Sequence, residues 1–475
     1  MRSTLLASHV RGSVLRRSLR QPLARHASSS TVMDIASEAD AKAGSTFEEG
    51  NVLLTNRKIA WKPRTAAGRV PVETSQLFSS SNDPLQHTES DVGRLYQLDG
   101  STTAFEQLFY HTGLCGTHVE GRATQLQTSA TLVRRVGLEL RDELLGWQRE
   151  GQLGERTGLL LNGERGVGKS VMLNYLLHCC HQAGWLVVAV PHAADWTLGL
   201  GAKSNLFANE AYRITDRTYF TDVPPELAET MLYEAPDASA NFLIATYLSQ
   251  REKLAQIAIK GEERRQHYAA HAADPAFGPT LADMLASFAT DGHNGFADFP
   301  MPVRPVYDFL AELQLVTEMP TVLAVDGHNM WDMMASSCRW LSKQPLHASE
   351  LLVPSMLADM HAYGGQMANG VMLCATSRGG GVRPKGVPKK LRKYFPPPHD
   401  YSRPRTLPAA TRELLRQVEP YNQAEVQSAL EFYALTGHLQ NAELQSQLRT
   451  GEMSTKVGLL TAGVADDVFR IAEQM

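Results

Sequence analysis

The sequence predicts an α/β fold in which a parallel sheet, flanked by helices, carries a phosphate-binding loop. The first observation is GERGVGKS at residues 163–170, a complete G-x-x-x-x-G-K-[ST] pattern. The second is its context, because an apolar run of buried-strand type at 158–161 precedes it and a helical pattern at 170–181 follows it. The third is that apolar runs of the same kind recur at 185–190, 321–326 and 370–378. Strands joined by helical crossovers are typical of a parallel sheet.

Residues 163–170, called the glycine loop below, contain the residue types that a nucleotide phosphate site requires. The three glycines let the backbone aim successive amide hydrogens at one point, and the next helix adds its positive N-terminal end. Lys169 is placed to reach the β- and γ-phosphates, and Ser170 offers a hydroxyl to Mg. We therefore predict a nucleotide site formed by Gly163, Glu164, Arg165, Gly166, Val167, Gly168, Lys169, Ser170 and Val171.

Two later strands end in polar residues. Asp326 ends the run at 321–326, and an aspartate at such a strand tip can hold the magnesium ion through a water. The alternative is a turn aspartate beside Gly327. Thr376 and Ser377 lie at the end of the run at 370–378. We expect them beside the strand of Asp326, as candidate sensors of the γ-phosphate, with an ordinary turn as the alternative.

Length and composition set broad limits. At 475 residues the chain exceeds one ordinary core, and 43% apolar with 20% charged residues is a normal soluble composition. No apolar stretch approaches 18 residues, so a membrane-spanning helix is not expected. The five cysteines show no CxxC pair and no zinc-type spacing with histidine, and we expect reduced core thiols.

The first 33 residues have the composition of a mitochondrial transit peptide. They contain six arginines, no acid before Asp34, and apolar residues that can form one side of an amphipathic helix. The matrix is therefore the expected location, and a basic tail that binds nucleic acid is the alternative. Without these arginines the formal charge falls from −4 to about −10. Contact with nucleic acid must then be local.

Two basic segments are candidates for such contact with RNA. The first, near Trp61, interleaves basic groups with an aromatic ring, although a solvated charge cluster explains it equally well. The second, residues 378–405, is basic and aromatic, and its consecutive glycines and prolines indicate a loop. The candidates are Arg57, Lys58, Lys62, Arg64, Arg383, Lys385, Lys389, Lys390, Arg392 and Lys393.

The expected organisation has four parts: a transit peptide at 1–33, an N-terminal arm and irregular region at 34–128, the core at 129–405, and a C-terminal helical lid at 406–475. Within the core, a helical pattern begins near Thr131 and includes Leu132. A helical insertion covers about 202–316, with helices expected at 242–259 and 280–288. The lid helices present apolar faces, one of which includes Leu435.

Hydrolysis of the nucleotide is expected to be slow or absent. Hydrolytic enzymes of this class often carry a glutamate directly after the metal-binding aspartate, whereas Gly327 stands here. His328 could polarise a water, but a histidine in a surface turn is the simpler interpretation. The N-K-x-D signature for guanine is absent after the fourth strand, so motifs do not separate guanine from adenine.

Several segments together resemble the death-associated-protein-3 family, the nucleotide-binding protein of the mitochondrial small ribosomal subunit, in a fungal-type version. They include GERGVGKS, WLVVAVPHAADW, FLIATYLSQRE, VLAVDGHN, VMLCATSRGGGVRPK and YNQAEVQSALEFY, within residues 132–475. The resemblance implies an AAA-like P-loop core, bound GTP or GDP with Mg, and contact with ribosomal RNA and neighbouring mitochondrial ribosomal proteins. Gly163, Lys169, Ser170 and Asp326 match the family's site positions. ATP is not excluded.

Three functions are therefore compared. The leading one is a structural ribosomal subunit stabilised by a bound nucleotide. The second is a free mitochondrial AAA-type ATPase or GTPase, which the missing acid after Asp326 disfavours. The third is a nucleotide or metabolite kinase using Arg378 or Arg383 on a lid, which the long insertion and the basic loop disfavour.

Overall fold

A computed structural model of the chain describes residues 79–97, 130–156, 158–193, 196, 211–290, 300–333, 335–336, 346–362, 367–377, 409–436, 439 and 442–474. All of them belong to the larger of two units of the chain, Leu53–Met475.

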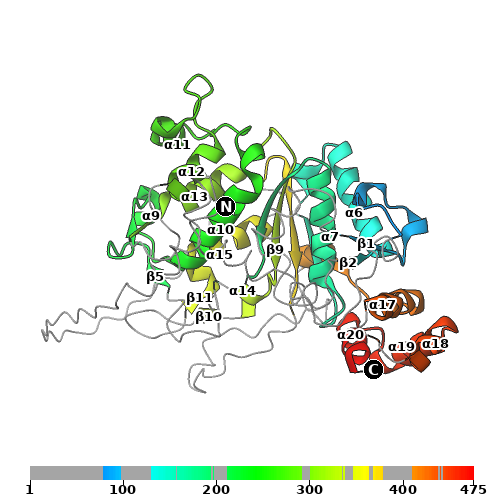
Figure 1. The fold of residues 1–475 in the computed structure, drawn as a ribbon. Coiled ribbons are helices and arrows are strands. Elements are labelled where there is room, and N and C mark those ends of the chain that lie inside the picture. The colour runs from blue at the N-terminus through cyan, green and yellow to red at the C-terminus, as the bar shows by residue number, and fades with distance from the viewer. Residues whose placement is uncertain are drawn as a thin grey trace, which may run out of the picture. The chain divides into compact units, whose positions relative to one another are not determined.

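A sheet of five described strands carries the glycine loop (Figure 1). Its strand order is β13-β3-β12-β9-β4, and every neighbouring pair is parallel. The strands are β3 (Gly158–Asn162), β4 (Leu186–Val190), β9 (Thr321–Asp326), β12 (Gly370–Ala375) and β13 (Leu415–Gln417). The first four confirm the expected strands. The sequence does not indicate β13, because three residues with one apolar side chain form no recognisable pattern.

Helices cover both faces of this sheet, which gives a mixed α/β arrangement of three layers (Figure 1). Alternate residues of each strand point to opposite faces. Val187 and Ala189 pack with α6 and α7, whereas Leu186, Val188 and Val190 pack with α10, α12 and α13. These helices are α6 (Arg135–Arg149), α7 (Lys169–Gln182), α10 (Pro236–Leu254), α12 (Leu281–Thr290) and α13 (Arg304–Leu313).

The expected helices at 242–259 and 280–288 correspond to α10 and α12. The expected end of the first is wrong, because α10 ends at Leu254 and Ala258 forms an antiparallel bridge with Thr280. Short elements make up much of the remaining described chain: β1 (Leu95–Gln97), β2 (Ala130–Leu132), β5 (Tyr212–Arg213), β6 (Phe220–Thr221), α9 (Pro225–Ala228), β7 (Tyr233–Glu234), α11 (Glu262–Tyr268), β8 (Met301–Pro302), α14 (Met330–Met333), β10 (Ala335–Ser336), β11 (Leu346–His347), α15 (Leu352–Ala362) and α16 (Ala409–Leu414).

The helix expected from near Thr131 is confirmed as α6, but the expected start is wrong. Thr131 and Leu132 belong to β2, which pairs antiparallel with β1, and α6 begins only at Arg135. The physical reason is tertiary: Leu132 in β2 and Tyr96 in β1 are buried, and the amide of Val133 donates to the carbonyl of Arg94. Pairing between segments this far apart in sequence overrides the local helical pattern.

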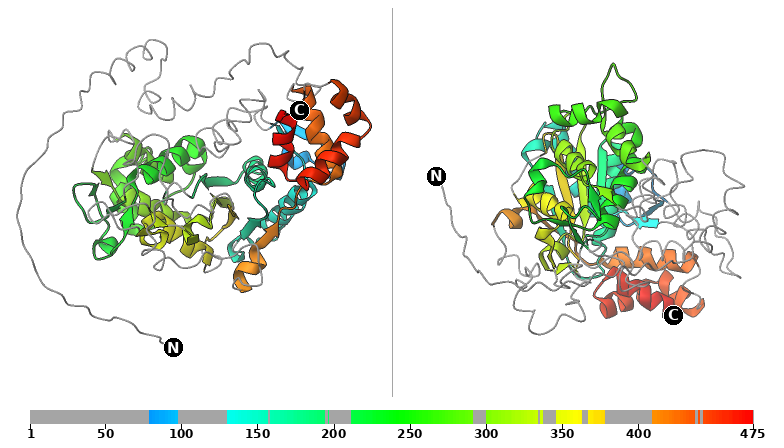
Figure 2. Two further views of the ribbon diagram at one scale, coloured as in Figure 1. Left: turned by 90° about the horizontal axis from the view of Figure 1, so that it is seen from below. Right: turned by 90° about the vertical axis from the view of Figure 1, so that its left-hand side faces the viewer.

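The C-terminal helices α17 (Gln423–Leu435), α18 (Ala442–Arg449), α19 (Glu452–Thr461) and α20 (Ala465–Gln474) share one apolar core, seen as an orange-to-red group in Figure 2. They are called the C-terminal cluster below. Val426, Leu430, Val468 and Phe469 lie in this core, as expected. Leu435 does not, because it ends α17 with 43% of its surface exposed. None of the helices in the described ranges combines the length and apolarity needed to cross a bilayer.

Candidate nucleotide-binding site

The glycine loop lies between the end of β3 and the start of α7, which confirms the predicted strand–loop–helix context. Its glycines have backbone angles that favour glycine: φ is +154° at Gly163, +84° at Gly166 and +97° at Gly168. Gly168 is also the N-cap of α7, so the loop passes directly into the positive end of that helix. This arrangement suits an anion.

Lys169 is the first residue of α7 and its side chain folds back over the loop. Its Nζ donates to the carbonyl oxygens of Gly163 at 3.1 Å and of Glu164 at 2.7 Å. The residue is 7% exposed. A buried ammonium held by two carbonyl groups of a glycine-rich turn is a fixed positive charge for a phosphate. Glu164 and Arg165 are exposed, whereas Val167 is fully buried and anchors the loop to the core.

Asp326 ends β9 and meets the other predicted magnesium ligand, Ser170. The Ser170 hydroxyl hydrogen-bonds the Asp326 carboxyl, although the two residues are far apart in sequence. Burial raises the pKa of Asp326 to about 6, against the lowering effect of Ser170, Lys169 and the Gly327 amide. A hydroxyl and a desolvated carboxylate beside an ammonium fit the oxygen donors that Mg prefers. When bound, that ion would supply charge neutralisation to the phosphates.

The structure places β12 beside β9, with Ala375 opposite Asp326, as the hypothesis about Thr376 and Ser377 requires. Thr376 is 2% exposed, and its hydroxyl donates to the side-chain oxygen of Asn162 at 3.0 Å. Ser377 is held through its backbone by Asn329. The end of β12 is therefore tied to the ends of both neighbouring strands, and a role in sensing phosphate stays a prediction.

The expectation of a surface histidine after Gly327 is wrong. His328 is 6% exposed and its ring lies near Trp331, with ring centroids 5.8 Å apart. Burial lowers the pKa of His328 to about 4, so the imidazole is neutral at physiological pH. The turn folds inward because the amides of Gly327 and His328 both donate to the carbonyl of Ala375.

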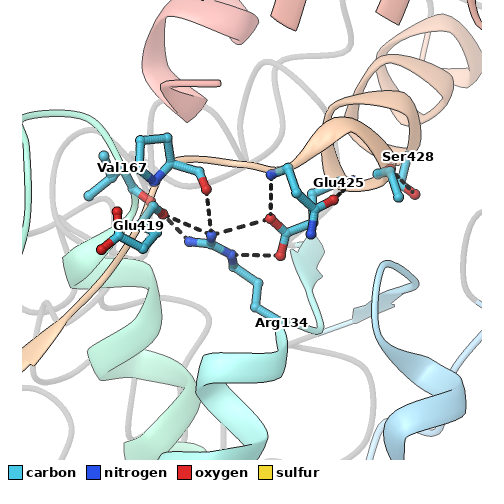
Figure 3. A network of polar contacts seen from close by, with 8 residues as sticks. Arg134, Val167, Glu419, Glu425 and Ser428 are labelled. Atoms are coloured by element: carbon cyan, nitrogen blue, oxygen red, sulfur yellow. Dashed lines mark hydrogen bonds and ion pairs between the residues drawn. The ribbon is translucent and has the colours of Figure 1, made fainter. Parts of the chain in front are cut away.

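Sequence reasoning missed a second layer of residues around the loop. Arg134 reaches the loop backbone and the start of the C-terminal cluster, as Figure 3 shows. Its partner Glu425 lies 291 positions away, so no local pattern reveals the pair. The Asn422-x-x-Glu425 capping box was readable from sequence as a helix start. Asn162 and Asn329 carried only the weaker signal of polar residues at strand ends.

Several predictions fall on residues outside the described ranges. They are the transit peptide, Arg378, and all ten candidate RNA contacts: Arg57, Lys58, Lys62, Arg64, Arg383, Lys385, Lys389, Lys390, Arg392 and Lys393. Within the described ranges, Cys179, Cys180 and Cys374 are buried free thiols, and burial raises the pKa of Cys180 to about 12. No three His, Cys, Asp or Glu side chains in those ranges lie where they could hold a metal ion together.

Comparison with known proteins gives the family. The chain is 30% identical over 130 residues to "Small ribosomal subunit protein mS29" of Bos taurus, and 29% identical over 138 residues to the protein of the same name of Mus musculus. These stretches cover 27% and 28% of this chain, and only 31% and 32% of the two relatives. The sequence model of the family described as "Mitochondrial ribosomal death-associated protein 3" matches residues 131–464, which include the whole sheet and the glycine loop. The chain therefore belongs to the mitochondrial ribosomal death-associated protein 3 family.

Proposed function

We propose that the chain is a structural constituent of the mitochondrial small ribosomal subunit that binds a purine nucleotide with Mg at the glycine loop. The observation that carries the nucleotide proposal is the convergence of Lys169, Ser170 and Asp326 at the carboxyl edge of the sheet. The ribosomal part rests on the family and on the names of the bovine and mouse relatives. By resemblance the nucleotide is GTP or GDP, with ATP as the alternative.

The arrangement supports an AAA-like P-loop core as the finer description of the fold. β12 lies between the strand that precedes the glycine loop and the strand that ends at Asp326. Thr376 and Ser377, which follow β12, then lie between the end of β3, where the glycine loop begins, and Asp326 at the end of β9, and can approach the phosphates as well. The proposed location is the mitochondrial matrix, on the ribosome, with ribosomal RNA and neighbouring mitochondrial ribosomal proteins as partners.

In this proposal the nucleotide is part of the architecture. A ligand that binds only the folded state stabilises it by RT ln(1 + [L]/Kd), about 2.7 kcal/mol at a hundredfold excess over Kd. That is a large fraction of the 5–15 kcal/mol, roughly, by which domains are stable. The loop's own backbone links this stabilisation to the C-terminal cluster, because the carbonyl of Gly166 accepts a hydrogen bond from the amide of Asp466.

The test is the identity of the nucleotide released when protein purified from mitochondria is denatured. Chromatography should find one purine nucleotide per chain, and gradient sedimentation should place the protein with the small ribosomal subunit. Lys169→Ala should lower the melting temperature in the presence of Mg-GTP or Mg-GDP. Lys456→Ala is the matched control, because Lys456 forms only an exposed ion pair with Glu452. Empty protein whose melting temperature does not rise with any purine nucleotide would contradict the proposal.

A further inference from the structure

Arg134, the N-cap of α6, connects the glycine loop to the C-terminal cluster (Figure 3). The residue is 8% exposed. Its guanidinium donates to the carbonyl of Val167 at 3.3 Å and to that of Glu419 at 2.8 Å. It also forms a two-pronged ion pair with Glu425, at 2.9 and 3.3 Å. One rigid fork of donors therefore holds the loop and the entry to α17 at the same time.

Glu425 has a second role in the same place. It is residue N3 of α17, and its carboxylate accepts from the backbone amide of Asn422 at 2.9 Å, while the Asn422 side chain accepts from the amide of Glu425. This reciprocal capping box fixes the first turn of the helix. The carboxylate that pairs with Arg134 is thus the one that caps the first turn of α17. A shift of the guanidinium would therefore displace this carboxylate and disturb the capping box.

A second contact joins the loop to α20. The amide of Asp466 donates to the carbonyl of Gly166 at 3.0 Å. A Cβ on Gly166 would lie 2.6 Å from Cβ of Asp466 and 3.1 Å from Val464. A third contact, from the amide of Val418 to the carbonyl of Asn162 at 2.7 Å, holds the residue before Gly163. The backbone at the start of the loop therefore packs directly against the backbone of the segment that follows β13.

The contacts made to the loop itself engage carbonyl groups, those of Val167 and Gly166, and this decides where the paired amides of the loop point. In a planar trans peptide the C=O and the N–H point in opposite directions. The carbonyl of Val167 shares its peptide plane with the amide of Gly168, and the carbonyl of Gly166 shares its plane with the amide of Val167. Holding these carbonyls outward, toward Arg134 and Asp466, turns the paired amides toward the inside of the loop, where an anion would lie.

We propose that Arg134 is a positioning residue that couples nucleotide binding at the glycine loop to the packing of α17 and α20. The inference rests on the proposed nucleotide binding. Phosphate held by the inward amides fixes the same peptide planes that Arg134 and Asp466 hold from outside. Nucleotide binding then favours the docked C-terminal cluster, and docking of the cluster tightens nucleotide binding by the same factor.

The test compares three variants of the purified 475-residue chain. Arg134→Lys keeps the charge but loses the fork. Glu425→Gln keeps a capping residue at N3 but loses the ion pair. Arg416→Lys is the matched control, since Arg416 forms a two-pronged pair with Glu143 at 2.6 and 3.2 Å. For each, Kd values are measured for Mg-GDP, Mg-GTP and Mg-ATP, together with amide hydrogen exchange in α17 and α20 with and without nucleotide.

In the wild type, nucleotide should slow exchange in α17 and α20. Arg134→Lys and Glu425→Gln should weaken nucleotide binding about tenfold and abolish that slowing, while Arg416→Lys behaves as the wild type. A lower melting temperature with unchanged Kd and unchanged slowing would overturn the inference, because it shows a merely structural ion pair, and nucleotide binding would stand. If the wild type binds none of the three nucleotides, the proposed function fails and this inference with it. If Arg134→Lys does not fold, Glu425→Gln alone decides.

Discussion

The side chain of Asn329 forms two hydrogen bonds with the backbone of Ser377, accepting from its amide at 2.7 Å and donating to its carbonyl at 3.0 Å. Asn329 lies in the turn after β9, and Ser377 follows the end of β12. A side-chain amide that satisfies both backbone groups of one residue substitutes for a ladder pair where the sheet itself ends. It fixes the turn that begins at Asp326, and hence the proposed magnesium ligand.

Asn329→Ala should destabilise the protein by about 1–3 kcal/mol. The side chain of Asn329 is buried, with 3% of its surface exposed, and its removal leaves the amide and the carbonyl of Ser377 without this partner. Urea unfolding measures the change. Asn369→Ala is the control, since the side chain of Asn369 donates one exposed hydrogen bond, to the carbonyl of Thr317. It should change stability by less than about 0.5 kcal/mol. Equal effects of the two substitutions would show that the bond pair contributes nothing particular.

Gly166→Ala should destabilise the protein more than Gly184→Ala. Both glycines have left-handed backbone, with φ of +84° and +86°, so alanine adds a similar strain of about 1–2 kcal/mol at each. Around Gly184 nothing lies within 4 Å of a new Cβ, whereas at Gly166 the start of α20 must move. Thermal unfolding of the two variants isolates that contact. Equal melting temperatures of the two variants would mean that α20 can move away from the new Cβ at no measurable cost in stability.

Glu234 should make the protein less stable as the pH rises from about 4.5 to about 7. Its side chain is fully buried, and burial raises its pKa from 4.5 to about 7, against hydrogen bonds from Ala235, Ser239 and Val353. Between pH 4.5 and about 7 the folded state keeps the proton that the unfolded state releases. The stabilisation from this group is therefore fully present below pH 4.5 and declines as the pH rises toward about 7. The loss is on the order of 3 kcal/mol.

The difference in unfolding free energy between wild type and Glu234→Gln, measured from pH 4.5 to 8, isolates this group. Glutamine cannot accept from both backbone amides that the carboxylate now satisfies, at 2.7 and 3.1 Å. The variant should be less stable at low pH and approach the wild type at high pH. Glu473→Gln, at an exposed position of α20, should give a curve parallel to the wild type. A constant difference for Glu234→Gln would refute the assignment.

The four central strands could be predicted from the sequence, because strands that are buried on both faces of a sheet appear as continuous apolar runs. The expected strand at 321–326 coincides with β9, and Lys169, Ser170 and Asp326 come together as their motif positions imply. Elements whose conformation depends on pairing with a segment distant in sequence could not be predicted in this way. Thr131 lies in β2, where it pairs with Tyr96 of β1, so the helix expected from near Thr131 begins only at Arg135. β13 is a short strand beside β3, and its only signal is this pairing.

The layer behind the glycine loop lay beyond sequence reasoning for a related reason. Arg134 and Glu425 are unremarkable charged residues in the sequence, and only the docking of the C-terminal cluster makes them a buried pair. His328 became a buried neutral group because its turn folds under Ala375, which no pattern of apolar residues announces. The roles predicted for the two basic segments in RNA binding stay predictions, since those residues lie outside the described ranges.

Hydrolysis of Mg-GTP or Mg-ATP by the purified chain should be slower than about one turnover per second, the lower end of ordinary enzyme rates. The residue after Asp326 is Gly327, with φ of +76°, where an acidic side chain would strain the backbone. His328 is buried and its pKa is lowered to about 4. Single-turnover assays measure the rate, with Lys169→Ala as the background. Gly327→Glu should lower stability by about 1–2 kcal/mol without accelerating the reaction. A wild-type rate of one per second or faster, abolished by Lys169→Ala, would instead establish an enzyme that cycles with its nucleotide.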